Sequence, residues 1–204
     1  MDIEALKAPL DKRHVMSRVQ GKTAVYYITA WHAIAEANRI FGFDGWTRET
    51  VSTVCVSERE RKIGKGQYEK DGWGVTYTSM VRIRALGITR EGTGAGHGID
   101  ADCGQAHESA IKEAESDAMK RALMTFGNAF GLALYDKEQA NVEDVAARDV
   151  MIGKFIKRLA SVETAAALNA AWAAVMANNP DVCASKSFKD AFDARMAALP
   201  GDAQ

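Results

Sequence analysis

The sequence of 204 residues has few cysteines, and this scarcity excludes one class of protein. Cys55, Cys103 and Cys183 lie far apart and form no CxxC pair. Small secreted proteins held by disulfides carry a denser, evenly paired set of cysteines. We therefore expect a protein of a reducing compartment.

Long hydrophobic runs are also missing. No stretch approaches the roughly 20 apolar residues that a membrane-spanning helix needs. The opening segment, MDIEALKAPLDKR, lacks the basic and then apolar order of an export signal. The sequence therefore predicts a cytoplasmic protein that makes no membrane contact.

Neither sign of charge dominates. The formal net charge is −1, from 26 Lys and Arg against 27 Asp and Glu. Such a balance gives no general sign of nucleic-acid binding. A site for a polyanion would have to come from a local arrangement of cations.

The first 140 residues contain patterns of both helix and strand. Residues 29–41 carry an apolar stripe at helical spacing, with Thr29 as a candidate N-cap, and glycines end this helix. Alternating or β-branched runs predict three strands, and between the first two lies a charged segment, 57–72, that we interpret as a long polar hairpin tip. The strands are expected at 47–56, 74–86 and 87–98. A long helix is expected from about Gln105 to Phe130, with a buried stripe of Ile111, Ala114, Ala118, Ala122, Phe126 and Ala129.

These patterns predict an α+β fold, in which an antiparallel β-β-β-α core packs its sheet on the long helix. After residue 138 the composition becomes rich in alanine with helical spacing, broken at 161–164 and 178–181. We expect two domains, 1–140 and a small all-helical module of about three helices at 145–204. The core of that module is predicted to contain Leu159, Leu168, Trp172, Val175, Met176, Phe188, Phe192, Met196 and Leu199.

The segment MKRALMTFGNAFG, 119–131, places Lys120 next to Arg121 at the end of the long helix. Adjacent helical residues point about 100° apart, so both cannot enter one core. The pair should flank the alanine stripe and face outward or into a groove. A structural explanation stays open, because cations favour a helix C-terminus and Gly131 could be its C-cap.

Sequence motifs of known catalytic or cofactor-binding sites are scarce. There is no GxxxxGK[ST], and GTGAGHG (92–98) is not followed directly by a helix, so a strand or turn explains it better than a phosphate loop. The segment HGIDADCGQAHE (97–108) has potential metal ligands, but their spacing is irregular, which favours a polar loop that caps the long helix. These are His97, Asp100, Asp102, Cys103, His107 and Glu108. We therefore predict that the chain is not an enzyme and has no catalytic residue, metal ligand or cofactor. The alternative is a metal-dependent nuclease whose metal ligands come from this cluster.

Two longer segments carry a resemblance to a known family. AIKEAESDAMKRALMTFGNAFGLALYDKE (110–138) resembles the signature helix of the Rad52 family of single-strand annealing proteins. ANRIFGFDGW (37–46) is similar to that family's element after its first helix, and MVRIRAL and GHG fall where the family has paired strands and a glycine turn. The resemblance covers about residues 15–138 and suggests a prokaryotic or phage-type member.

The resemblance implies a core that assembles into a ring or filament, with single-stranded DNA in an outer basic groove. Lys120 and Arg121 would contact phosphates there, and His32, Arg39 and Phe43 would lie near the same groove. Lys137 and Lys65 would belong to a second DNA-contacting surface. Met124 stands where a basic residue is common, and His32 where arginine is common, so the resemblance implies weaker, more salt-sensitive binding.

The expected function is ATP-independent binding and annealing of single-stranded DNA in homologous recombination and double-strand break repair, as a recombination mediator. The expected partners are single-stranded DNA, other copies of the chain, and a single-strand-binding protein or exonuclease recruited by the helical module. The expected location is the cytoplasm, in association with the nucleoid. A second alternative is an RNA-binding or structural module without annealing activity.

Overall fold

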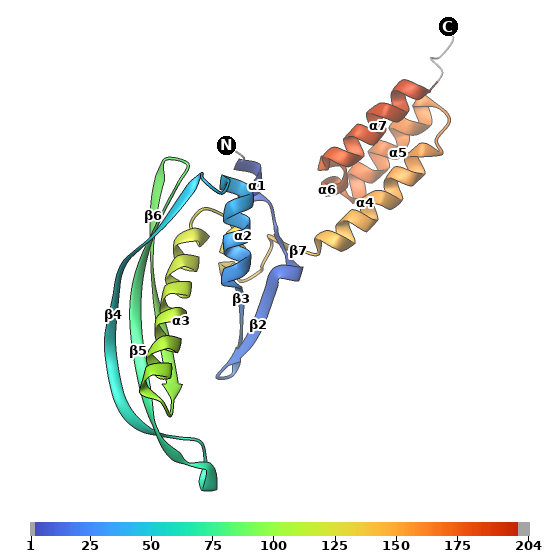
Figure 1. Cartoon of the computed structure of the whole chain (residues 1–204). Helices are drawn as coiled ribbons and strands as arrows, with labels where there is room; N and C mark the ends of the chain where they lie inside the picture. Colours follow the sequence, from blue (N-terminus) through green and yellow to red (C-terminus); the bar gives the residue numbers. More distant parts are fainter. Residues whose placement is uncertain (1–2, 200–204) are drawn as a thin grey trace. The chain divides into compact units, whose positions relative to one another are not determined.

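The structure is a computed structural model that describes residues 3–199 (Figure 1). The chain forms two compact units, one ending at Glu143 and the other beginning at Asp144. In the described range, no helix has both the length and the apolar character needed to cross a bilayer.

The first unit is built on a curved antiparallel sheet of three strands in the order β4-β5-β6 (Figure 1). Their bounds are β4 Trp46–Ile63, β5 Lys70–Ala85 and β6 Ile88–Asp100. Helix α3, Cys103–Met124, packs along one face of this sheet. The predicted α+β class, with three strands followed by a long helix, is confirmed.

The predicted polar tip at 57–72 is mostly wrong, because β4 and β5 continue through it. Only the segment between Ile63 and Lys70 turns, around the short 3-10 helix η2, Gly66–Tyr68. Strand pairing satisfies the backbone groups, and the charged side chains stay in solvent. Across the two strands, Lys62 and Asp71 form an ion pair of 2.5 Å. A highly charged segment can therefore be strand when its side chains face water.

The interface between β6 and α3 is made of the smallest residues. The glycines on the helix-facing side of β6 are Gly92, Gly94, Gly96 and Gly98. Opposite them, the alanines of α3 with 0% exposure are Ala106, Ala110, Ala114, Ala118 and Ala122. The segment GTGAGHG is thus a strand, as predicted, and not a phosphate-binding loop. Its GHG part is also strand, so the glycine turn that the resemblance implied there is not formed.

Helix α3 ends earlier than predicted, at Met124 in place of Phe130. Gly131 has a left-handed φ of +91°, and a Cβ on Gly127 would lie 2.2 Å from the backbone oxygen of Leu6. The chain therefore leaves the helix and continues as two 3-10 turns, η3 Asn128–Phe130 and η4 Leu132–Tyr135. In the predicted stripe, Ile111 and Phe126 are only partly buried.

The N-terminal segment, to which the sequence assigned no element before residue 29, packs beside α3 (Figure 1). Its elements are α1 Ile3–Lys7, β1 Leu10–Asp11, η1 Lys12–His14 and the antiparallel hairpin of β2 Val15–Gln20 and β3 Thr23–Ile28. β1 pairs in parallel with β7, Val142–Glu143, which closes the unit. Helix α2, Ala30–Phe41, follows, and the predicted N-cap is confirmed because the Thr29 hydroxyl accepts from the backbone N–H of His32.

The described part of the second unit, residues 144–199, contains four helices where about three were predicted. They are α4 Val145–Ala160, α5 Ala165–Asn178, α6 Pro180–Ala184 and α7 Lys186–Ala198. The additional break is at Ser185, whose hydroxyl caps α7 by accepting from Phe188 N–H. The predicted core residues pack together except Met176, which is 49% exposed.

Candidate nucleic-acid interface

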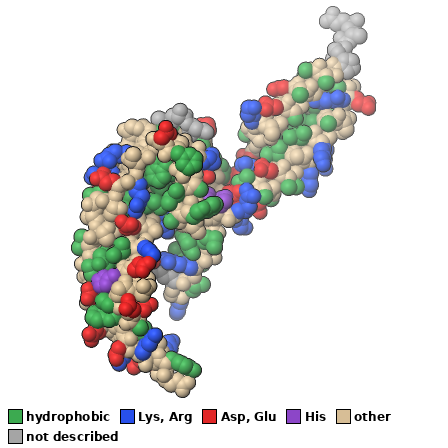
Figure 2. All heavy atoms as spheres, in the orientation of Figure 1, with side chains coloured by type: hydrophobic (Ala, Val, Ile, Leu, Met, Phe, Trp, Pro, Cys, Tyr) green, Lys and Arg blue, Asp and Glu red, His purple; other side chains and the backbone are tan. Residues whose placement is uncertain are grey.

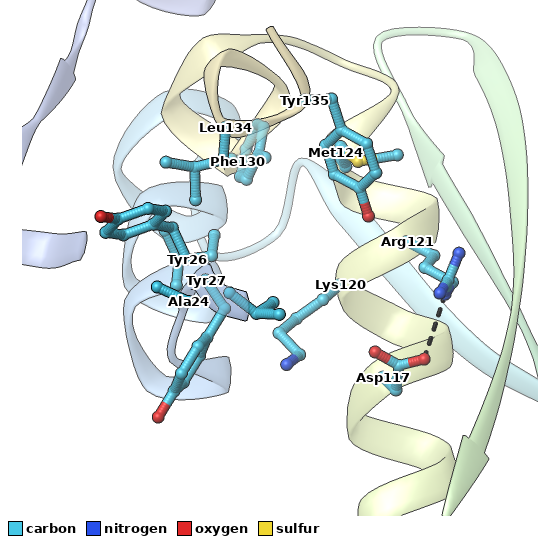
Figure 3. A pocket seen from close by; sticks show the side chains of 13 residues that line it. Ala24, Tyr26, Tyr27, Asp117, Lys120, Arg121, Met124, Phe130, Leu134 and Tyr135 are labelled. Atoms are coloured by element: carbon cyan, nitrogen blue, oxygen red, sulfur yellow. Dashed lines mark hydrogen bonds and ion pairs between the residues drawn. The ribbon is translucent and has the colours of Figure 1, made fainter. Parts of the chain in front are cut away.

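An open groove runs between α3 and the β2–β3 hairpin (Figure 3). Its larger part encloses about 660 Å³ and a smaller, overlapping part about 360 Å³. Both parts are lined by Val25, Tyr26, Tyr27, Asp117, Lys120, Arg121 and Tyr135. The basic pair thus flanks the buried alanine stripe and faces a groove, as the helix geometry predicts.

Lys120 points into the space between the helix and the hairpin (Figure 3). Its Nζ lies 5.8 Å from the centroid of the Tyr27 ring, a cation–π contact. Within residues 3–199, no carboxylate forms an ion pair with Lys120. Its charge is therefore available to an anion in the groove.

Arg121 is held differently. Its Nε donates to the Asp117 carboxylate one helical turn earlier, at 3.0 Å (Figure 3). This hydrogen bond and the charge of Asp117 raise the pKa of Arg121. The guanidinium stays charged, but an incoming phosphate has to compete with Asp117 for it.

The groove carries charges of both signs (Figure 2). Arg18 of β2 adds a third cation, and Glu113 of α3 adds a second carboxylate. Glu113 is already engaged, because one of its oxygens accepts from the backbone N–H of His97 on β6 at 2.8 Å. The excess of cations is small, which agrees with the balanced composition of the chain.

His32 does not lie where the resemblance placed it. It is 5% exposed and stacks on His14, with ring centroids 4.1 Å apart. Burial first, and then the nearby His14, lowers the pKa of His32. The first turn of α2 packs into the core of the unit, so this side chain is covered and offers no surface cation.

The other four predicted site residues are exposed but lie elsewhere in the unit. Arg39 on α2 pairs with Glu36, and Phe43 is 86% exposed in the turn after α2. Lys65 lies at the tip of the β4–β5 hairpin, and Lys137 follows η4. The structure of one chain thus brings only Lys120 and Arg121 together, and the DNA-binding role of the others stays a prediction.

Sequence reasoning missed the opposite wall of the groove. Arg18, Tyr26 and Tyr27 come from the β2–β3 hairpin, and Tyr135 comes from η4. A signal was present, because TAVYYI is rich in β-branched and aromatic residues and follows a glycine turn at Gly21, where φ is +64°. The hairpin could have been found from it, but not its position beside α3.

The polar segment at 97–108 does not form the ligand set drawn from the sequence. Asp102 is the N-cap of α3 and accepts from Gln105 N–H at 2.9 Å, which confirms the capping of the helix. The predicted loop is wrong, because β6 continues to Asp100 and α3 begins at Cys103. Asp100 accepts from Asp102 N–H, and Glu108 pairs with Lys112. These carboxylates are used in local structure, which argues against a nuclease centre built from this segment.

Comparison with known proteins gives one consistent result. Residues 3–150 match the family described as "Rad52/22 family double-strand break repair protein". The "DNA repair and recombination protein RAD52" of Eremothecium gossypii is 39% identical over 145 residues, which is 67% of this chain and 31% of that protein. The protein of the same name from Saccharomyces cerevisiae is 36% identical over 145 residues, covering 66% of this chain and 28% of its own length.

The "DNA repair and recombination protein rad22" of Schizosaccharomyces pombe is 37% identical over 119 residues, 57% of this chain and 24% of that protein. The matched part is thus at most about a third of the length of these relatives. They come from fungi, so the expectation of a prokaryotic or phage-type member is not borne out. Because the family match spans well over half of the sequence, this chain belongs to the Rad52/22 family of double-strand break repair proteins.

Proposed function

We propose that the first unit binds single-stranded DNA and anneals complementary strands in homologous recombination and double-strand break repair. The observation that carries this proposal is the groove between α3 and the β2–β3 hairpin, which both Lys120 and Arg121 line. The names of the matching relatives, DNA repair and recombination proteins, support it. Annealing breaks no covalent bond, so the proposal requires neither ATP, nor a cofactor, nor a catalytic residue.

The cations of the groove suit a phosphate backbone better than base edges. Lys120 offers a charge without a carboxylate partner in the described chain, and Arg121 can exchange Asp117 for a phosphate. Phosphate contacts position a strand without reading its sequence, which is what annealing of any complementary pair needs. Each contact also makes binding more sensitive to salt.

One groove with a small excess of cations binds weakly, and we propose that a homo-oligomeric ring or filament puts many grooves in series. Linked weak sites gain avidity without new contacts, because later contacts form at high effective concentration. The exposed Arg39, Phe43, Lys65 and Lys137 would then contact DNA or a neighbouring copy along such an assembly. Association with the nucleoid or other chromosomal DNA is part of the same proposal.

The test is the double variant Lys120→Ala/Arg121→Ala. Loss of two phosphate contacts should weaken binding of single-stranded DNA about tenfold or more, and reduce the slope of log affinity against log salt by about 1.4. Annealing of complementary oligonucleotides should be lost with it. The matched control is Lys154→Ala/Lys157→Ala on α4, which removes the same charge from exposed positions of the second unit.

Normal annealing by the Lys120/Arg121 double variant would show that the groove is wrongly assigned. Light scattering on the purified chain, with and without an oligonucleotide, tests the assembly separately. A purely monomeric mass under both conditions would contradict the ring or filament.

We further propose that the second unit recruits a partner, such as a single-strand-binding protein or an exonuclease. It has its own hydrophobic core and an apolar groove of about 300 Å³ between α4 and α5, lined in part by Phe155, Leu159, Ala171 and Ala174. Ala174→Glu places a charge on an exposed position of this groove. It should reduce pull-down of such a partner while annealing stays normal; a loss of annealing would contradict the division of roles.

A further inference from the structure

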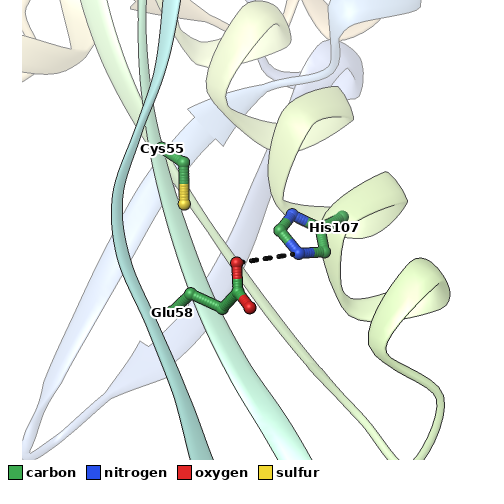
Figure 4. Close-up of side chains that lie close together, drawn as sticks. All are labelled: Cys55, Glu58 and His107. Atoms are coloured by element: carbon green, nitrogen blue, oxygen red, sulfur yellow. Dashed lines mark ion pairs between the residues drawn. The ribbon is translucent and has the colours of Figure 1, made fainter.

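At the junction of β4 and α3, three side chains of different donor chemistry come together (Figure 4). The thiol of Cys55, a carboxylate oxygen of Glu58 and a ring nitrogen of His107 all lie within 4.8 Å of one another. Cys55 and Glu58 belong to β4, whereas His107 lies in the second turn of α3. This cluster is made by the fold, because His107 is about 50 residues away from Cys55 and Glu58 in the sequence.

A β-bulge explains how two residues three positions apart can share one face. In a regular strand, residues i and i+3 point to opposite faces of the sheet. Between Cys55 and Ser57 the pairing with β5 shifts, which leaves Val56 as an extra residue. After the bulge, Glu58 points to the same side as Cys55.

Pairing across the sheet shows that this side faces α3. Cys55 pairs with Tyr77 and Glu58 pairs with Val75, and paired residues lie on one face. Val75 is 2% exposed and packs against Ala106 and other residues of α3. Without the bulge, only one of the two donors could reach His107.

The imidazole of His107 is oriented at both nitrogens. Its Nε2 lies 3.3 Å from a carboxylate oxygen of Glu58, and its Nδ1 lies 3.0 Å from the Tyr77 hydroxyl. Metal-binding histidines usually have such an outer hydrogen bond on the nitrogen that does not bind the metal. Here Nδ1 can donate to the Tyr77 oxygen, which leaves the Nε2 lone pair directed toward Glu58.

We propose that Cys55, Glu58 and His107 bind a zinc ion, and that Tyr77 positions His107. Sulfur, imidazole nitrogen and carboxylate oxygen are the ligands of zinc in proteins, and three of them leave a fourth position for water. With the imidazole proton on Nδ1, His107 offers its Nε2 lone pair and Glu58 a carboxylate oxygen, so the ion would displace only the proton of the Cys55 thiol, which passes to solvent. It would fasten the long strand β4 to the start of α3, and this revises the expectation that the chain has no metal ligand.

The experiment uses the full purified chain, stripped of metal and kept reduced, and titrates it with zinc alone by calorimetry. We expect one zinc per chain in the wild type, and affinity at least about a hundredfold weaker in Cys55→Ser and in His107→Gln. Tyr77→Phe should retain the site with about tenfold weaker affinity, as expected for a residue that acts through a ligand. The matched controls Glu60→Gln and His97→Gln change exposed neighbours of the same kinds and should bind as the wild type does.

Two further measurements begin with the wild-type chain. Cobalt alone should give a thiolate charge-transfer band in the wild type, and Cys55→Ser should lose it. Zinc should also slow alkylation of Cys55 in the wild-type chain. Absence of zinc uptake by the wild type, or uptake that Cys55→Ser leaves unchanged, would overturn the proposal.

The zinc proposal and the DNA-groove proposal can be refuted independently of each other. Lys120→Ala/Arg121→Ala should bind zinc as the wild type does, since neither residue belongs to the cluster. Loss of zinc binding in that variant would contradict the site as drawn.

Discussion

Helix α3 has two sides that differ in almost every physical respect. The side toward the sheet carries alanines at 0% exposure, packed directly on the glycines of β6. The side that lines the open groove beside the β2–β3 hairpin carries Asp117, Lys120 and Arg121. The first side packs the helix directly against the backbone of the sheet. The second side presents charged side chains from this rigidly held helix. Stability and proposed binding should therefore respond to different substitutions.

The largest effect is expected from Gly96→Ala on the packed side. The added Cβ would lie 2.1 Å from the Ala110 oxygen and 2.4 Å from the Ala114 nitrogen, both of them backbone atoms that no side-chain rotation can move away. Helix and sheet would have to separate, and such overpacking should cost about 3 kcal/mol or more. Calorimetric unfolding should show a lower transition temperature for the first unit.

A matched variant on the neighbouring position sharpens this prediction. Ala95→Val adds volume on the same strand but at an exposed residue of the opposite face, and should change stability by less than about 1 kcal/mol. The transition of the second unit should stay in place in both variants. Equal losses in the two variants would mean that the strand itself, and not its contact with α3, determines the stability.

The next effect is expected on the open side, from Asp117→Asn. This change releases Arg121 from its 3.0 Å ion pair and removes a negative charge from the groove. Affinity for single-stranded DNA should rise about threefold, whereas stability should change by less than about 1 kcal/mol, as usual for an exposed pair. Fluorescence anisotropy with a labelled oligonucleotide measures the change in DNA affinity, and calorimetry measures the change in stability.

Its control is Asp190→Asn on α7, which breaks the ion pair with Lys186 at the same i,i+4 spacing in the second unit. That variant has the same change in charge and should bind DNA as the wild type does. Weaker binding by Asp117→Asn would indicate that Asp117 supports the groove by holding Arg121 in position.

The difference between the two sides also explains how much could be predicted from the sequence. The alanine stripe and the Lys120–Arg121 pair follow from helical spacing, so the buried side and the exposed side of α3 could be assigned. Spacing also located α2, the three strands and the small helical unit. These features depend on residues that are neighbours in the sequence.

What could not be predicted depends on distant contacts. The end of α3 is set by Gly127 against Leu6, and His32 is buried because His14 covers it. The bulge at Val56, which brings Cys55 to His107, follows from the register of β4 on β5 and leaves no mark in the sequence. The far wall of the groove likewise requires knowing where the hairpin packs. Local patterns define elements, whereas the sites lie between them.

The smallest effect is expected from the hairpin wall, where Tyr27 lies under the Nζ of Lys120 at 5.8 Å. Tyr27→Ala removes the ring that holds the ammonium in the groove, an interaction of about 0.5–1 kcal/mol at exposed sites. Affinity for single-stranded DNA should fall about twofold, the lower end of this range, because the ring centroid lies near the roughly 6 Å limit of such contacts. The salt slope should be unchanged because no charge is lost. Tyr27→Phe keeps the ring and should bind as the wild type does. If Tyr27→Phe were as weak as Tyr27→Ala, the hydroxyl, and not the contact with Lys120, would be what the DNA requires from this wall.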